Sequence, residues 1–213
     1  MKKTAVVYFS KHGATAKYAG WIARETGADL FNGHDIRRKD LQDYEIIVFG
    51  GGIYGGGIQG IDFIRKGIRN VFRDKLILCF AVGISVQEEA NRKQANSINF
   101  TKKMEDIPCW YLPGAYDPSA VKGLDKRLMA ITRKMLENGG GSSAFGNTLK
   151  GYIDDGCDLV DQKYIRPICG AIIRAQRGEP VLGGNGSVPG PDDLEDQDAQ
   201  EASSSSGGDQ PEV

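Results

Sequence analysis

Six consecutive residues near the N-terminus combine hydroxyl, basic and glycine side chains in a pattern suited to binding phosphate. They are Ser10, Lys11, His12, Gly13, Ala14 and Thr15. They follow a β-branched and aromatic run (residues 4–10) and precede a helical pattern (residues 15–25), so they join a strand to a helix. Free amide groups and a partial positive charge at a helix start favour a phosphate. The alternative is a tight turn that Ser10 and Thr15 cap.

These residues do not match the common nucleotide-binding motifs. The spacing lacks the G-x-x-x-x-G-K-[ST] pattern of ATP- and GTP-binding loops and the G-x-G-x-x-G pattern of dinucleotide-binding folds. Gly13 allows close approach of the backbone, and Lys11 adds positive potential. The loop therefore indicates a phosphate site of another kind.

Two further loops could bind a planar ring. Residues 50–57 contain six glycines, and the ring-binding candidates among them are Gly52, Ile53, Tyr54 and Gly55. Six glycines carry a high entropic cost that a plain turn does not require. We therefore expect the backbone here to lie flat against a ligand. A flexible lid is the alternative. After the next apolar run, three residues could cover the other side of the ring: Gly83, Ile84 and Ser85.

Alternating apolar and amphipathic segments place these loops at one edge of a sheet. Strands are predicted over residues 4–10, 28–32, 45–49, 75–82 and 109–112, and helices over residues 15–25, 61–72, 87–103, 124–136 and 164–177. Right-handed crossovers then predict an α/β fold, a doubly wound five-stranded parallel sheet with helices on both faces. Ligands bind beyond the carboxyl ends of such strands.

Charge divides the 213-residue chain into two parts. The net charge is −1, but nine acidic residues and no basic ones follow residue 178. The 27 basic residues and the remaining 19 acidic residues (28 minus 9) therefore give residues 1–178 a charge of +8. We expect one domain over residues 1–178 and a disordered acidic tail over residues 179–213. The basic domain suggests acidic redox proteins, anionic ligands or an anionic membrane surface as partners, or charge for solubility alone.

Location is predicted from what the sequence lacks. No apolar run is long enough to cross a membrane and no signal peptide is recognisable, so we expect a cytoplasmic protein without a transmembrane segment. Cys79, Cys109, Cys157 and Cys169 fit no common metal-binding spacing, and we expect reduced core thiols and no metal site.

Two motifs resemble the flavodoxin family. Residues 8–15 (YFSKHGAT) with Ala19, Ile22 and Ala23 resemble its first strand, phosphate loop and first helix, and residues 44–57 (YEIIVFGGGIYGGG) resemble its third strand and ring-binding loop. The resemblance covers most of residues 1–178. It implies strand order 2-1-3-4-5 and FMN as cofactor. It also implies that residues 10–15 hold the FMN phosphate, residues 52–55 flank the isoalloxazine with Tyr54 stacking on it, and residues 83–85 line its far side.

The sequence departs from ordinary flavodoxins at three points. His12 stands where the family usually has Thr, and it could donate to the phosphate or point to solvent. Glycine replaces a small hydroxyl residue and proline in the ring loop. The domain is basic, whereas ordinary flavodoxins are acidic.

A second resemblance lies further along the chain. Residues 112–116 (LPGAY), 126–129 (KRLM) and 134–140 (KMLENGG) resemble flavodoxin-fold, quinone-dependent protoporphyrinogen oxidases, which are basic proteins acting at the membrane. The basic residues there, beside Met129 and Met135, could form a peripheral membrane or porphyrin surface. A packing helix with a solvated basic face is the alternative.

Three functions remain open, and no side chain is assigned a catalytic role. The first is an FMN-binding electron carrier acting between protein or small-molecule partners. The second is a flavin-dependent oxidoreductase that acts on a quinone or porphyrinogen. The third is a non-flavin α/β module that binds a phosphorylated ligand. A receiver-type regulator is disfavoured because acids are absent at the strand ends. Nucleic-acid binding is disfavoured because the basic residues are scattered.

Overall fold

The computed structural model describes residues 1–140 and 144–181 and contains the predicted parallel sheet. Its five parallel strands are β2 (Asp29–Asn32), β1 (Thr4–Phe9), β3 (Ile46–Tyr54), β5 (Leu76–Gly83) and β6 (Cys109–Pro113), in that spatial order. In chain order of the parallel strands this is 2-1-3-4-5, so the predicted topology is confirmed. A short strand, β4 (Gly57–Ile58), pairs antiparallel with the end of β3.

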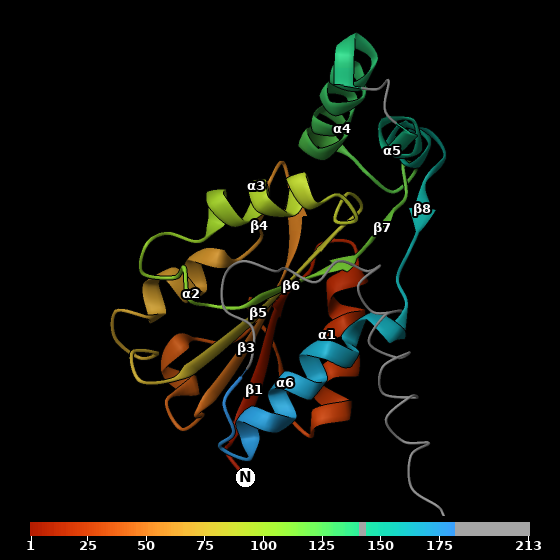
Figure 1. Cartoon of the computed structure of the whole chain (residues 1–213). Coiled ribbons are helices and arrows are strands. Elements are labelled where there is room, and N and C mark those ends of the chain that lie inside the picture. The colour runs from red at the N-terminus through yellow and green to blue at the C-terminus, as the bar shows by residue number, and fades with distance from the viewer. Residues whose placement is uncertain (141–143, 182–213) are drawn as a thin grey trace, which may run out of the picture.

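Helices cover both faces of this sheet (Figure 1). Alternate strand residues point to opposite cores: Val6 and Val48 lie in the core beside α1 and α6, whereas Val7 and Phe49 lie in the core beside α2. Because both faces are buried, the strands read as continuous apolar runs. The covering helices are α1 (Ala14–Thr26), α2 (Ile61–Gly67), α3 (Glu89–Asn99) and α6 (Arg166–Gln176).

Three predicted helices are shorter in the structure. The helix expected over residues 61–72 ends at Gly67, where the Phe72 ring folds back so closely that a Cβ on Gly67 would lie 2.1 Å from it. The helix expected over residues 87–103 is α3. The last helix was expected to begin near Tyr164, but a short 3-10 turn (Gln162–Ile165) precedes α6, and Pro167 lies in the first turn of α6 as predicted.

The glycine run is the main local correction. We expected residues 50–57 to form a loop, but β3 continues through Gly50, Gly51 and Gly52 to Tyr54 and pairs with β5 as far as Gly52. A Cβ on Gly50 would lie 2.1 Å from the Phe80 ring, and a Cβ on Gly51 would lie 2.4 Å from the Gln59 carbonyl oxygen. These two glycines therefore serve internal packing, and only Gly55 and Gly56 form the turn of the β3–β4 hairpin, with φ of 56° and 83°.

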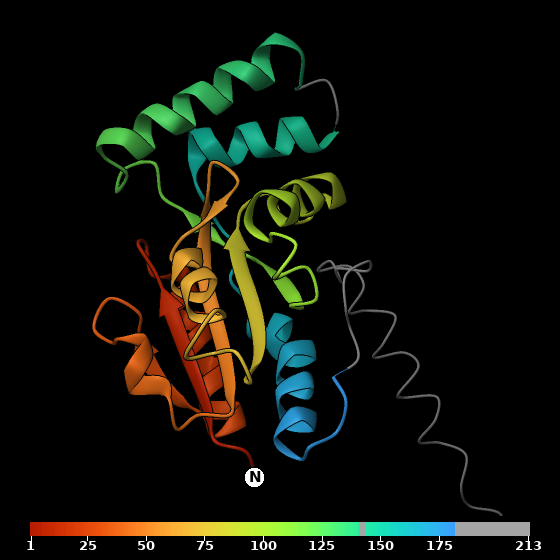
Figure 2. The same cartoon turned by 90° about the vertical axis from the view of Figure 1, so that its left-hand side faces the viewer.

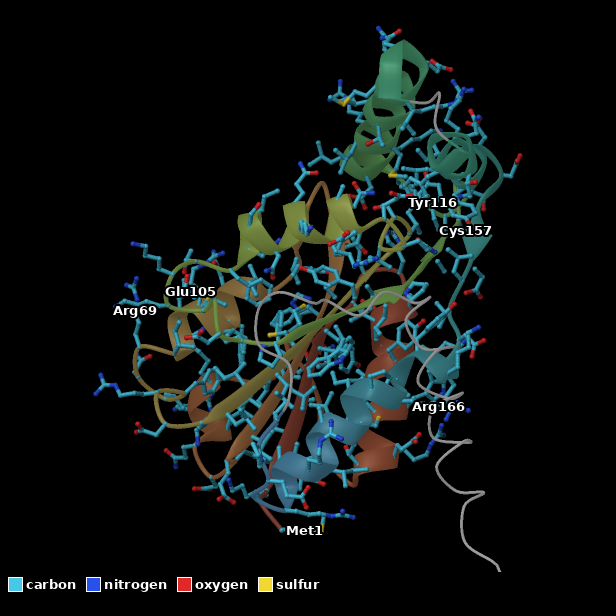
Figure 3. All side chains as sticks on the ribbon, viewed as in Figure 1. Met1, Arg69, Glu105, Tyr116, Cys157 and Arg166 are labelled. Carbon is cyan, nitrogen blue, oxygen red and sulfur yellow. The ribbon has the colours of Figure 1, made fainter. Side chains whose placement is uncertain are left out.

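Beyond the carboxyl ends of the strands lies a pair of helices that the sequence predicted only in part (Figure 2). The expected helix over residues 124–136 is α4 (Gly123–Met135), which continues as a π-helical turn (Leu136–Gly140). The second helix, α5 (Ala144–Asp155), was not predicted. A small antiparallel ladder joins the pair to the domain: Tyr116 of β7 (Ala115–Tyr116) pairs with Cys157 of β8 (Cys157–Asp158), as Figure 3 shows.

The remaining expectations concern thiols, membranes and the tail. All four cysteines are free; Cys79, Cys109 and Cys169 are buried in the cores, and Cys157 is partly exposed. Within residues 1–140 and 144–181, no helix is both long and apolar enough to span a bilayer, and no cluster of three potential metal ligands occurs. Most of the predicted tail, residues 182–213, lies outside the described residues.

Candidate functional site

The loop after β1 enters α1 through a turn at Gly13. Gly13 adopts φ 95° and ψ −31°, a conformation that costs glycine little, and its amide donates to the Ser10 hydroxyl at 3.2 Å. The first helical hydrogen bond runs from the Lys17 amide to the Gly13 carbonyl. The preceding amides in the first turn of α1 (residues 14–16) consequently have no carbonyl partner within the described part of the chain. Backbone amides of this kind at a helix start are available to donate to an anion.

Tyr54 connects this loop to the β3–β4 hairpin. Its ring lies back over Gly52, where a Cβ would come within 2.9 Å of the ring edge. The His12 ring centroid is 5.9 Å from the Tyr54 ring, and the Lys11 ammonium is 5.7 Å from it. Burial, helped by the nearby Asp125 carboxylate, raises the pKa of Tyr54 to about 12, so its phenol is neutral at physiological pH. Two of the predicted elements thus meet around one aromatic ring.

The loop after β1 pairs with an acidic residue that the sequence did not indicate. Asp125, in the first turn of α4, forms an ion pair with Lys11 and lies 3.4 Å from the Nε2 atom of His12. Hydrogen bonding to Lys11 lowers the pKa of the Asp125 carboxyl, with a smaller contribution from His12. A few residues on, Leu128 lies beside Gly55 of the hairpin, 3.5 Å from where a Cβ would be. α4 therefore contacts both the loop after β1 and the hairpin.

The loop after β5 is held by the N-terminal end of α3. Asn91 donates from Nδ2 to the Ser85 carbonyl at 3.1 Å, and Arg92 donates to the carbonyls of Val86 and Gln87, both at 2.7 Å. Arg92 is buried, and no carboxylate pairs with it among the described residues. Backbone carbonyls therefore replace water around this cation, and they fix the segment that follows Gly83 and Ile84.

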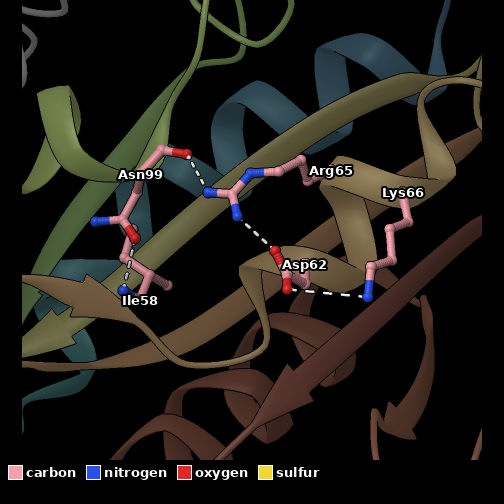
Figure 4. A network of polar contacts seen from close by, with 5 residues as sticks. All are labelled: Ile58, Asp62, Arg65, Lys66 and Asn99. Carbon is pink, nitrogen blue, oxygen red and sulfur yellow. Dashed lines mark hydrogen bonds and ion pairs between the residues drawn. The ribbon is translucent and has the colours of Figure 1, made fainter.

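The C-terminal end of the same helix holds the hairpin, as Figure 4 shows in part. The Asn99 side chain accepts from the Ile58 amide at 2.8 Å and donates to the Gly56 carbonyl at 2.7 Å. The Asn99 carbonyl accepts from Arg65, which also pairs with Asp62 of α2. Asn99 is 2% exposed, so its amide has little access to water as an alternative partner.

One helix therefore positions both of the loops predicted to contact a ring. Arg92, Ala95 and Asn99 are the buried residues of α3, and their spacing puts them on one face. We expected this helix only as a polar, helix-permissive stretch, because the hydrophobic pattern is weak where a buried face is polar. The spacing of Arg92 and Asn99, two turns apart on that face, is the one signal that could have suggested their role.

Residues 10–15, the hairpin and the loop after β5 all follow the carboxyl ends of neighbouring strands, as predicted. The structure brings Lys11, His12 and Tyr54 together, and it places Ile53 on the opposite side of β3, with its Cδ1 atom 3.3 Å from where a Cβ on Gly83 would lie. The roles of these residues toward a ligand stay predictions.

Comparison with known families identifies the fold family directly. A family model described as a flavodoxin domain matches residues 5–142, well over half of the chain. The chain belongs to the flavodoxin domain family. The match includes the phosphate loop, the hairpin, the loop after β5 and the whole of α4. No curated protein gave a significant sequence match to this flavodoxin domain.

Solved structures with similar folds come from several bacteria. A WrbA-like flavodoxin from Agrobacterium tumefaciens is 23% identical, with 46% of this chain and 69% of that chain covered and a TM-score of 0.37. A flavoprotein in complex with FMN from Lactobacillus acidophilus is 18% identical over 53% of this chain and 93% of its own, with a TM-score of 0.37. Rubredoxin oxygen:oxidoreductase from Desulfovibrio gigas is 16% identical over 84% of this chain and 37% of its own, with a TM-score of 0.42.

Proposed function

We propose that this flavodoxin domain binds FMN and transfers electrons between redox partners. The observation that carries the proposal is the meeting of the phosphate loop with the hairpin around Tyr54, at the carboxyl edge of a sheet with the flavodoxin strand order. We further propose that residues 1–178 form the cofactor-binding domain, that the tail begins at residue 179 and that the protein acts in the cytoplasm.

The residues of the loop after β1 suit the phosphate end of FMN. The amides of the first turn of α1 would donate to phosphate oxygens, with the hydroxyls of Ser10 and Thr15 as further donors. Gly13 keeps this turn open because its φ of 95° is rarely accessible to other residues. Lys11 would supply positive charge once its pairing with Asp125 is shared with or replaced by the phosphate.

The residues of the hairpin and the loop after β5 suit the ring end. Tyr54, whose ring covers Gly52, would lie against the isoalloxazine, and the hairpin turn at Gly55 would flank it. Residues 83–85 would limit the access of water from the other side, with Arg92 and Asn91 holding that loop in place. When bound, FMN would supply reversible one- and two-electron chemistry, and the chain would supply binding, orientation and shielding.

The first test is a titration of the purified chain with FMN, followed by visible absorption after removal of excess. We expect a retained, structured flavin spectrum. Thr15→Asp should release FMN by charge repulsion at the phosphate, and Thr15→Ser should retain it. The affinity for riboflavin, which lacks the phosphate, should be nearly unchanged by Thr15→Asp. A wild-type chain that stays colourless would refute the flavin proposal and favour a non-flavin phosphate ligand.

A second candidate function is quinone-dependent oxidation of a porphyrinogen. It is supported by the placement of α4, which carries part of the resemblance to protoporphyrinogen oxidases, directly beside the hairpin through Leu128 and Gly55. The test is oxidation of protoporphyrinogen by the FMN-loaded chain with a quinone acceptor. Activity that depends on both FMN and quinone would establish the enzyme, and inactivity beside an active control would leave the electron carrier.

A further inference from the structure

The outer face of α4 is an exposed apolar stripe. Leu124, Ile131 and Met135 are 79%, 57% and 69% exposed, and α4 contains no buried residue. Their spacings of seven and four residues put all three on one side of the helix. In Figure 1, α4 stands out at the end of the molecule beyond the sheet. Three large apolar side chains together on one exposed face indicate that something covers them.

Positive charge lies along one side of this stripe. Lys122, Lys126, Arg127 and Lys134 are exposed, and no ion pair is recorded for them within the described residues. The other base of the helix, Arg133, is bound by Asp154 and Glu137, each at 2.5 Å. The single acid of α4, Asp125, is engaged by the phosphate loop. Arg127 is three residues from Leu124, and Lys134 is three residues from Ile131, so these two cations border the stripe, whereas Lys126 lies further round the helix and Lys122 precedes it.

The chain itself contains a segment of matching chemistry. Six acids lie within residues 192–201 (DDLEDQDAQE), with Leu194 among them and no basic residue. The nine acids of the tail nearly cancel the +8 charge of residues 1–178. A linked segment is present at an effective concentration on the order of millimolar, so even weak attraction gives substantial occupancy.

The connecting chain is long enough to reach α4. The end of α6 lies beside the start of β1, where the Lys2 amide donates to the Gln176 carbonyl at 3.1 Å. The tail therefore leaves from the edge of the sheet opposite α4. Crossing the sheet along β3, nine residues long, takes about 30 Å. Fully extended, residues 182–192 reach about 37 Å and residues 182–201 about 68 Å.

We propose that the acidic segment of residues 192–201 docks on the outer face of α4. Lys134 and Arg127 pair with its carboxylates, and Leu194 contacts the stripe of Leu124, Ile131 and Met135. The docked tail competes with anionic partners for the surface beside the hairpin. The docking itself does not depend on a cofactor; only its effect on redox partners rests on the proposed FMN function.

Carbodiimide cross-linking of the full chain tests the docking directly, since it joins carboxylates to lysines that touch. We expect tail peptides joined to Lys134, which borders the stripe, at least about five-fold more than to the exposed Lys102 and Lys103, and suppression of these links in about 0.5 M NaCl. Uniform coupling over surface lysines would overturn the proposal. Links that join differently isotope-labelled copies would overturn it as well, since the tail would then occupy a second copy.

Amide hydrogen exchange of α4 gives an independent measurement. Neutralising the six acids (D192N/D193N/E195Q/D196N/D198N/E201Q) should raise exchange of residues 123–135 by about two- to five-fold. The control E105Q/D106N, which neutralises two exposed acids of the domain, should not change it. Unchanged exchange in the tail variant would count against docking. Because neither measurement needs flavin, failure of the docking and failure of the FMN proposal are distinguishable.

Discussion

Asp125 of α4 forms an ion pair with Lys11 of the loop after β1, so a carboxylate neutralises a cationic group of the loop that we propose to bind phosphate. His12 lies on the same carboxylate, with its Nε2 atom 3.4 Å away. Electrostatics therefore couples the position of the helix pair to any anion bound in the loop. A phosphate bound in this loop, as proposed, would compete with Asp125 for the same positive charge.

Replacing this carboxylate should strengthen phosphate binding. Asp125→Asn removes a negative charge beside the loop, so we expect FMN affinity to rise about two- to five-fold, in line with the modest energies of partly exposed pairs. Riboflavin affinity should stay constant, because riboflavin has no phosphate. Fluorescence titration of both ligands gives the comparison. Equal gains for the two ligands would mean that the effect does not act through the phosphate.

The same pair makes a pH-dependent contribution to stability. Because Lys11 lowers the pKa of Asp125 in the folded state, the stabilisation is present above the unfolded-state pKa of about 3.9 and is lost as pH falls through the lower folded pKa. Asp125→Asn should cost up to about 1 kcal/mol of unfolding free energy near pH 7 and nothing at strongly acidic pH. Urea denaturation across pH measures the difference. A cost that persists at acidic pH would point to lost packing instead.

Tyr54 should act through its ring and not through its phenol. Its pKa of about 12 keeps the hydroxyl neutral, so Tyr54→Phe should change FMN affinity by less than about two-fold. Tyr54→Ala should weaken FMN about ten-fold or shift the flavin midpoint potentials, because an aromatic contact is lost. Titration and potentiometry on the two variants separate these effects. Unchanged affinity and potentials in Tyr54→Ala would remove Tyr54 from the site.

Asn99 should be needed for the hairpin to keep its shape. Asn99→Ala leaves the Ile58 amide and the Gly56 carbonyl without their partner, which we expect to cost about 2–3 kcal/mol of unfolding free energy. FMN affinity should fall as well, under conditions where the variant is still folded. Ser97→Ala, on the exposed side of the same helix, is the control and should be nearly neutral. A stable variant with normal FMN binding would show that α3 does not position the hairpin.

Replacing glycine by alanine should lower or raise the stability of the protein according to the space around each glycine. Gly50→Ala forces a methyl group against the Phe80 ring, 2.1 Å away, and should destabilise by about 1–3 kcal/mol. Gly20→Ala, inside α1 with open space around it, should stabilise by up to about 1 kcal/mol. Thermal and urea unfolding of both variants measure the contrast. A neutral Gly50→Ala would mean that β3 and β5 repack easily.

The sequence alone determined the sheet and the edge at which to look. Continuous apolar runs show strands buried on both faces, and their alternation with helices fixes the parallel order, because crossovers have one hand. Residues 10–15 can be recognised as a loop because turn-forming residues stand between a predicted strand and a predicted helix. Patterns of this kind depend only on residues that are close in the sequence, so the sequence alone reveals them.

Only the tertiary structure decided what the glycine run, α3 and α4 do. Gly50 and Gly51 resemble loop residues in sequence, yet they are strand residues that pair with β5. They must be glycine because the Phe80 ring and the Gln59 carbonyl fill the space that a side chain would need. Arg92 and Asn99 look like solvated polar residues until their carbonyl partners are seen. Asp125 forms an ion pair with Lys11 although most of the domain's sequence lies between them. Such contacts depend on how distant elements pack, and no local periodicity records them.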